Sequence, residues 1–122
     1  MLQKIILWWA AAMYTLPGLA LVLMPQPFYD WLADFPPFNR HYMGDAGVFS
    51  FAIGVGLIWA ARRPAAHTSI IGVAALATVL HVLNHLYDDV IIGHETVRHM
   101  LLNTLPLFAL AIALIAVWRK SR

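Results

Sequence analysis

The sequence predicts an all-α integral membrane protein, a four-helix bundle forming a single domain over residues 1–122. Of the 122 residues, 61% are hydrophobic and 11% are charged, whereas a soluble domain is about half apolar and about a quarter charged. A soluble domain of this size buries only about two-thirds of its chain, so it could not hide this much apolar surface from water. Composition therefore argues against a soluble enzyme, a disordered tail and a nucleic-acid-binding protein.

Charged residues divide the chain into four apolar stretches. Three of them contain no charge, and the fourth, between Arg40 and Arg62, contains only Asp45. Each stretch can hold the ~20 residues of helix that cross about 30 Å of hydrocarbon. Apolar and polar residues do not alternate along them, which argues against strands, and four segments are too few for a closed barrel. We therefore predict transmembrane helices at residues 4–24, 41–61, 68–88 and 97–118.

The longest connection, residues 25–40, is rich in proline and aromatic residues. Proline stands at both ends of an apolar stretch that contains Phe28, Tyr29 and Trp31. This pattern predicts a short amphipathic helix that lies at the outer membrane surface between the first two spans. Its simplest role is to anchor and cap the bundle, and the alternative is a lid or lateral gate over a site.

Basic residues gather on one side of the predicted bundle. The N-terminus, the turn after the second span and the C-terminal segment carry six of the eight Lys and Arg residues, whereas Arg40 and Arg98 lie on the other side. Because positive residues remain cytoplasmic, we expect both termini to be inside, in a bacterial inner membrane. Tryptophan and tyrosine residues near both predicted boundaries fit the aromatic belts of such proteins.

Carboxylates and histidines show the opposite bias. All six acidic residues and five of the six histidines fall on the outer side or in the outer half of a span, with His67 as the exception. At 1.5 Å per residue, Asp45 lies roughly 7 Å, His81 roughly 10 Å and Asn103 roughly 7 Å below the outer end of its helix. Three predicted helices therefore carry polar groups at similar depth.

Helical spacing groups these polar residues on shared faces. The third span carries four of them at i, i+3, i+4 and i+7, which is one stripe of a helix. Polar groups at membrane depth normally face the bundle interior, so we expect the polar faces of three spans to meet in one cavity that opens outward. The residues expected to line it are Asp45, His81, Asn84, His85, His99 and Asn103.

The leading hypothesis is that this cavity binds a metal ion. His81 and His85 are spaced i, i+4, which puts two imidazoles on one helical face as in helical zinc sites. Asp45 and His99 would complete a mixed nitrogen and oxygen set suited to zinc, copper or iron; haem fits less well because the bundle is small. The residues expected to orient these ligands or to contact a bound molecule are Asn84, Asn103, Asp88, His41 and Arg40.

Two other classes of function stay open. A carboxylate beside an imidazole can move protons, so the cavity could serve an apolar substrate from the bilayer, such as a quinone, a sterol or another lipid. Alternatively the polar groups only hold the helices together, and the chain is an accessory subunit of a membrane redox complex. It could also form a homodimer, since the small residues Gly47, Ser50 and Gly54 allow close helix contact.

The second span opens Arg40-His41-Tyr42-Met43-Gly44-Asp45-Ala46-Gly47 and continues Gly54-Val55-Gly56-Leu57. With four short-looped helices and a polar third span, the chain resembles the broad DoxX-like group of small bacterial membrane proteins. That resemblance implies an accessory or electron-transfer setting beside quinone-linked oxidoreductases. The chain is also similar in outline to the four-helix sterol-isomerase and sigma-2-receptor-like fold, but only Asp45 matches the deep carboxylate pair of that family, which puts sterol isomerisation in doubt.

Overall fold

A computed structural model describes residues 1–33, 36–93 and 97–122 of the chain, and the regular structure in these ranges is helical, without a strand. The four longest helices are α1 (Leu2–Leu23), α3 (Arg40–Arg62), α4 (Thr68–Tyr87) and α6 (Leu105–Ser121). The shorter ones are α2 (Pro25–Phe28), η1 (Tyr29–Ala33), η2 (Pro64–His67), η3 (Asp88–Ile92), α5 (Val97–His99) and η4 (Met100–Thr104).

Four continuous helical segments are long and apolar enough to cross a membrane, as the sequence predicts. They cover Leu2–Leu23, Arg40–Arg62, Pro64–Ile92 and Val97–Ser121, with mean hydropathy between 1.5 and 2.3. The last two are longer than the predicted spans, because η2 and η3 extend α4 at both ends and α5 and η4 precede α6 without a break. The fold is therefore the all-helical, membrane-type architecture that the apolar stretches indicate.

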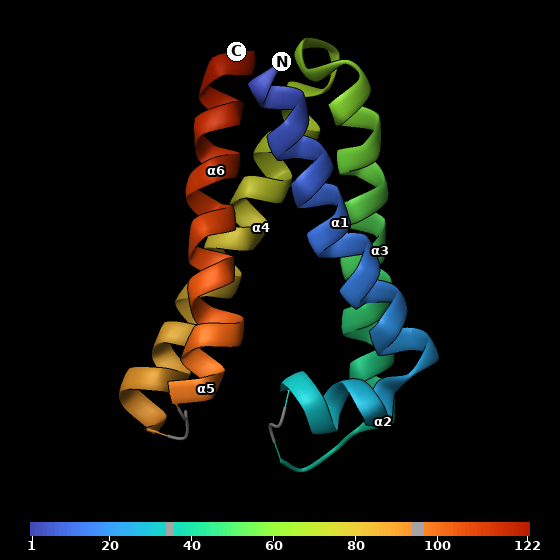
Figure 1. The fold of residues 1–122 in the computed structure, drawn as a ribbon, viewed down its shortest axis with the longest axis vertical. Helices are drawn as coiled ribbons and strands as arrows, with labels where there is room; N and C mark the ends of the chain where they lie inside the picture. Colours follow the sequence, from blue (N-terminus) through green and yellow to red (C-terminus); the bar gives the residue numbers. More distant parts are fainter. Residues whose placement is uncertain (34–35, 94–96) are drawn as a thin grey trace.

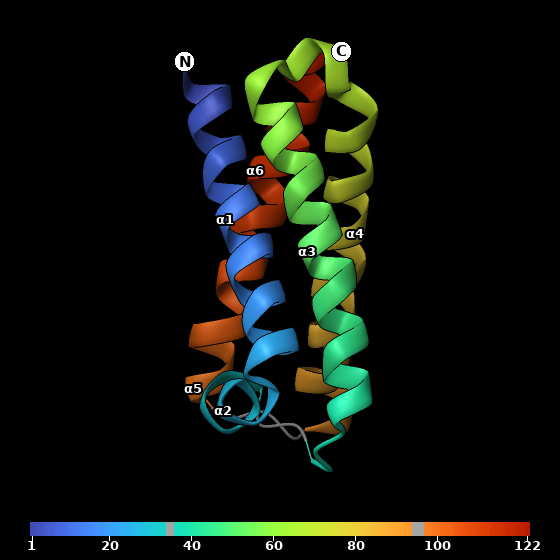
Figure 2. The same cartoon turned by 90° about the vertical axis from the view of Figure 1, so that its right-hand side faces the viewer.

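The four long helices associate as two pairs, α1 with α3 and α4 with α6 (Figures 1 and 2). Both termini and the η2 turn lie at one end, which we call the termini end. The opposite end carries α2 and α5, and we call it the α2–α5 end. Figure 1 shows the two pairs close together at the termini end and diverging toward the α2–α5 end.

The hydrophobic core lies where the two pairs meet, toward the termini end. Its largest fully buried side chains include Leu7, Leu57, Ile71 and Leu114, one from each long helix. Tyr14 closes this core: its hydroxyl lies 2.6 Å from Thr78 Oγ1, which itself donates to the carbonyl of Ala74. Tyr14 is therefore the donor, and this bond ties α1 to α4 across the two pairs.

Small residues allow α1 and α3 to approach closely. A Cβ added at Gly54 would lie 2.5 Å from Thr15 Cγ2, and one added at Gly18 would lie 2.6 Å from the backbone nitrogen of Phe51. Gly47 is equally tight, because an added Cβ would lie 2.9 Å from the carbonyl oxygen of Gly18. The predicted small-residue stripe on the second span is thus a close helix contact, and α1 covers its glycines.

The segment after α1 forms the short helix that the prolines predict. Helices α2 and η1 run across the α2–α5 end of the bundle instead of continuing along the direction of α1 (Figures 1 and 2). Pro25 and Pro27 start α2, where a missing N–H costs nothing. The ring of Tyr29 packs edge-on against Phe38, with 5.2 Å between centroids, and this contact folds the returning chain back before α3 begins.

Candidate functional site: a chain of histidines

Three histidines stand in series between α4 and the helix that leads into α6. His85 Nε2 lies 3.2 Å from Nε2 of His81, one turn earlier on α4. On its other side, His85 Nδ1 lies 3.4 Å from Nε2 of His99, the last residue of α5. The rings of His85 and His99 stack with 5.5 Å between centroids. The three imidazoles therefore form a hydrogen-bonded row, with His85 using both of its nitrogens.

Asn103 fixes one end of this row. Its amide nitrogen lies 3.2 Å from His99 Nδ1 and donates to the carbonyl of Leu32, in η1, at 2.8 Å. Since a carbonyl only accepts, the group facing Leu32 must be the amide N–H₂, and this settles which way the Asn103 amide points. The second hydrogen of that amide is then directed at His99 Nδ1.

The amide orientation is compatible with one continuous order of protons along the row. With Asn103 donating to His99 Nδ1 and the three imidazoles neutral, His99 carries its proton on Nε2 and donates to His85 Nδ1. His85 then donates from Nε2 to His81 Nε2, and His81 keeps its proton on Nδ1. In this arrangement the bonds point from Asn103 toward His81, and the row ends in the Nδ1–H of His81. His81 is exposed, whereas His85 and His99 are half-buried.

Acidic residues flank the row on η3. Asp88 accepts a hydrogen bond from the amide of Asn84 at 3.2 Å, on an exposed surface. Asp89 accepts from the buried hydroxyl of Thr104 at 3.0 Å, and its second oxygen is buried without a hydrogen-bond partner in the described part of the chain. The α4 and α6 segments are thus joined by a carboxylate contact next to the histidines.

Asp45 does not join this row. Its carboxylate lies 3.5 Å from His41 Nε2, one turn earlier on α3, and both side chains are mostly exposed. Arg40 is likewise exposed at the start of α3. Depth along each helix suggested convergence, but α3 belongs to the pair that diverges from α4 and α6 at this end (Figure 1). Of the predicted cavity lining, the structure connects His81, His85, His99 and Asn103.

A convergent metal centre is not assembled from these residues. In residues 1–33, 36–93 and 97–122, no group of three or more His, Cys, Asp or Glu side chains is arranged to hold a metal ion. The series geometry explains why, because His85 presents one nitrogen to each neighbour instead of all three rings aiming one nitrogen at a common point. Three acidic or histidine residues predicted for the outer side, Asp34, His94 and Glu95, lie outside the described residues.

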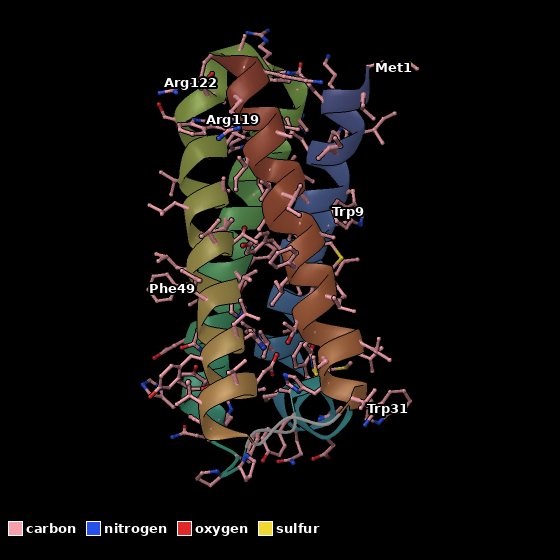
Figure 3. All side chains as sticks on the ribbon, turned by 90° about the vertical axis from the view of Figure 1, so that its left-hand side faces the viewer. Met1, Trp9, Trp31, Phe49, Arg119 and Arg122 are labelled. Atoms are coloured by element: carbon pink, nitrogen blue, oxygen red, sulfur yellow. The ribbon has the colours of Figure 1, made fainter. Side chains whose placement is uncertain are left out.

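Sequence reasoning missed the link between the row and the interfacial segment. Arg98 donates to the carbonyl of Trp31 at 2.9 Å, and Asn103 to the next carbonyl, that of Leu32. Figure 3 shows Trp31 at the α2–α5 end. Backbone carbonyls carry no signal in the sequence, so only the proximity of a proline-bounded helix to a histidine cluster could have suggested this contact.

Comparisons with protein-family models, with curated proteins and with solved structures found no match in any of the three.

Proposed function

We propose that the protein binds an apolar ligand carrying a proton-accepting oxygen, such as a quinone, and exchanges a proton with it through the imidazole row. The observation that carries this proposal is the series arrangement of His99, His85 and His81 at hydrogen-bond distances. Imidazole is the side chain best suited to proton transfer near neutral pH. A row with one defined direction of donation ends in one N–H, that of His81 Nδ1.

Proton transfer along the row balances in four moves when the ligand oxygen is anionic, as in the deprotonated form of a reduced quinone. When His81 Nδ1 gives its proton to that oxygen, His81 Nε2 takes the proton of His85 Nε2. His85 Nδ1 then takes the proton of His99 Nε2, and His99 Nδ1 takes a proton from water, which leaves as hydroxide. The last move requires the Asn103 amide to leave His99 Nδ1, so Asn103 and its anchor on η1 control the entry of protons.

The surroundings of His81 support an apolar ligand. His81 lies within the candidate span Pro64–Ile92 and is itself exposed. Its helix neighbours Leu80 and Leu83 are 57% and 55% exposed. A molecule that reaches His81 from the bilayer therefore meets aliphatic side chains beside the polar stripe of His81, Asn84 and His85. Ligand sites of this kind, mostly apolar with few polar groups, favour a lipid-soluble molecule with a single hydrogen-bonding oxygen.

Nitrogen-15 NMR of histidine-labelled protein in phosphatidylcholine bilayers tests the row and its ligand. We expect Nε2–H on His85 and His99, and Nδ1–H on His81.

Asn103→Leu should change the proton position on His99, whereas the matched variant Asn84→Leu should not, because among the described residues Asn84 donates to Asp88 and not to the row. Adding a short-chain quinone should shift the His81 Nδ1–H resonance. Unchanged histidine signals in Asn103→Leu would contradict the row, and an unshifted His81 at quinone saturation would contradict the ligand.

Divalent metal binding is the second candidate, and one distance favours it. Two nitrogen ligands at about 2.0–2.1 Å from a tetrahedral zinc ion are about 3.3 Å apart, and the Nε2 atoms of His81 and His85 are 3.2 Å apart. A copper or iron ion would place similar demands on the pair. His99 would have to turn to add a third nitrogen, and Asp45, predicted as a ligand, pairs with His41 instead.

Metal analysis of detergent-purified protein separates the two candidates. Bound zinc, copper or iron near one equivalent, lost in His81→Ala/His85→Ala but kept in the exposed control His41→Ala, would favour the metal site. The proton-relay proposal expects the same low metal content in all three proteins.

The finer cellular setting belongs to the same proposal. We propose a bacterial inner membrane location with both termini in the cytoplasm, because six of eight Lys and Arg residues lie at the termini end. An accessory role beside quinone-linked oxidoreductases, as the DoxX-like resemblance implies, would fit a quinone ligand. A reporter enzyme that is active only in the periplasm can be fused to either terminus. Activity of such a fusion would contradict the proposed orientation.

A further inference from the structure

The termini end carries a cluster of cations that the described chain does not neutralise. The described carboxylate side chains, Asp30, Asp45, Asp88 and Asp89, belong to the α2–α5 end, by the start of α3 and the end of α4. The one side-chain ion pair among the described residues joins His41 to Asp45, also at that end. Figure 3 shows Arg119, Arg122 and Met1 at the termini end. The described Asp side chains therefore leave these cations to solvent or to a bound anion.

Two of these cations share a recess. Arg62 and Arg63 line a hollow of about 280 Å³ with Trp59 and His67. Trp59 and Arg62 are spaced i, i+3 on the last turn of α3, and Arg63 follows as the C-cap residue of that helix. His67 closes the recess from η2, beyond the turn. Neither arginine makes a side-chain hydrogen bond or ion pair to another described residue, so both guanidinium groups stay available to a ligand.

The recess also has the position of a membrane interface. Arg62 and Arg63 end a helix that is long and apolar enough to span the bilayer, and Trp59 is 54% exposed one turn inside them. Indole rings prefer the headgroup level of a membrane, with the apolar ring inward and the N–H near water. From Trp59 toward the middle of α3 the surface of the helix is apolar. The recess therefore offers cations toward water and an aromatic ring toward the acyl chains.

A second hollow at the same end provides a comparison. It measures about 390 Å³ and is lined by Thr68, Ser69, Gly72, Val73, Leu76, Trp118 and Arg122. Its one cation, Arg122, already lies over the Trp118 ring, 4.4 Å from the centroid. The first recess has two cations without such a contact, and a phosphate with two guanidinium partners is bound more strongly and with more defined geometry than one with a single partner.

We infer that the recess of Trp59, Arg62, Arg63 and His67 binds the phosphate headgroup of an anionic phospholipid. The two guanidinium groups contact the phosphate oxygens, and Trp59 packs on the upper part of an acyl chain. A free phosphate offers the same oxygens but no chain to cover Trp59, so the site favours the lipid. Basic pockets beside membrane helices are known to take such headgroups.

Titration with phosphatidylglycerol tests the site. The full chain in a neutral detergent is titrated with the lipid, and bound lipid is counted by native mass spectrometry. Each basic residue near an anionic membrane surface is worth roughly a five-fold change in affinity, so Arg62→Gln/Arg63→Gln should lose about 25-fold. Arg119→Gln/Lys120→Gln removes the same charge from the same end outside the recess and should lose far less. Arg62→Lys/Arg63→Lys keeps the charge but removes the planar guanidinium groups with their paired N–H donors. This variant should bind the lipid with intermediate affinity.

Several outcomes would overturn the inference. Equal losses in the Gln pairs at 62/63 and at 119/120 would mean diffuse attraction to a charged surface and no site. Wild-type affinity in the Lys pair would also mean a general charge effect. Displacement of the lipid by inorganic phosphate at similar concentrations would mean an oxyanion site without lipid. The melting temperature of each variant is measured in phosphatidylcholine as a control. An unchanged value shows that the lipid affinities being compared are those of folded protein.

Discussion

Replacing Gly54 by alanine should separate α1 from α3, and the structure allows the cost to be worked out. The added Cβ would lie 2.5 Å from Thr15 Cγ2 and 2.7 Å from the backbone nitrogen of Thr15. Comfortable contacts between heavy atoms are about 3.5–4.0 Å, so α1 has to move away by about 1 Å. Rotating the Thr15 side chain relieves the first contact but not the second, because the nitrogen belongs to the α1 backbone.

The expected free-energy change follows from two opposing effects. Overpacking of a tight contact costs about 1–3 kcal/mol, and here the upper part of that range applies because a backbone atom must move. Alanine gains up to about 1 kcal/mol over glycine from helix propensity. Gly54→Ala should therefore destabilise the protein by about 1–2 kcal/mol. Gly44→Ala, on the same helix with nothing within 4 Å of its added Cβ, should be neutral or slightly stabilising.

Reversible unfolding in mixed detergent micelles, followed by circular dichroism, measures the difference between the two alanine variants. Adding Thr15→Ser to Gly54→Ala removes the methyl group but leaves the backbone contact, so we expect only partial recovery. Equal unfolding free energies for Gly54→Ala and Gly44→Ala would refute the close approach of α1 to α3. Full recovery with Thr15→Ser would place the clash in the side chain alone and refute the backbone part of the reasoning.

The remaining predictions concern single contacts. Tyr14→Phe and Thr78→Val should each lower the free energy of unfolding by about 0.5–1.5 kcal/mol. A double-mutant cycle should show coupling between the two substitutions, since the two hydroxyls are 2.6 Å apart. Zero coupling would exclude the bond. Gly72→Ala should shift the indole N–H resonance of Trp118, because the new Cβ would lie 2.7 Å from Trp118 Nε1; an unchanged resonance would contradict the packing. Asn39→Ala should lower stability by about 0.5–2 kcal/mol, as it removes the N-cap of α3, and no change in unfolding would count against the cap.

The sequence predicts the spans well because their cause is local. A stretch of about 20 apolar residues without charge has a single low-energy arrangement in hydrocarbon, a helix that satisfies its own backbone. The close contact at Gly47 and Gly54 is equally local, since small residues at helical spacing permit backbones to approach. Even the short helix at the α2–α5 end follows from its prolines. They favour a new helix that starts at Pro25, and they prevent the first span from continuing as one helix.

The candidate site is predicted only in part because it depends on which helices pair. His81 and His85 meet through their i, i+4 spacing on one helix, which needs no tertiary information. His99 joins them because α6 packs along α4. Asp45 was assigned to the same cavity from its depth and from the expectation that polar faces point into the bundle, but neither determines which neighbouring helix a face meets. Helix α3 packs against α1, and its polar turn stays exposed beside His41.

A second cause is the change of helical register next to the histidines. Sequence reasoning continued one 3.6-residue period through the fourth span, but residues Met100–Thr104 form a π-helical turn, closed by a bond from the N–H of Leu105 to the carbonyl of Met100. Pro106 follows directly and cannot donate to the carbonyl four residues before it, which favours such a turn. The extra residue rotates the helix between His99 and the regular part of α6.

That rotation explains why one partner of Asn103, the carbonyl of Leu32, was not foreseen, whereas its contact with His99 follows from their i, i+4 spacing. The next residue, Thr104, donates to Asp89. The turn that contains Asp89 is itself π-helical, and so is η1, which supplies the Leu32 carbonyl. Turns of this kind occur often at functional sites. The irregular turns of three separate segments therefore meet at the histidine row, and the regular helical period on which the sequence prediction rests does not hold there.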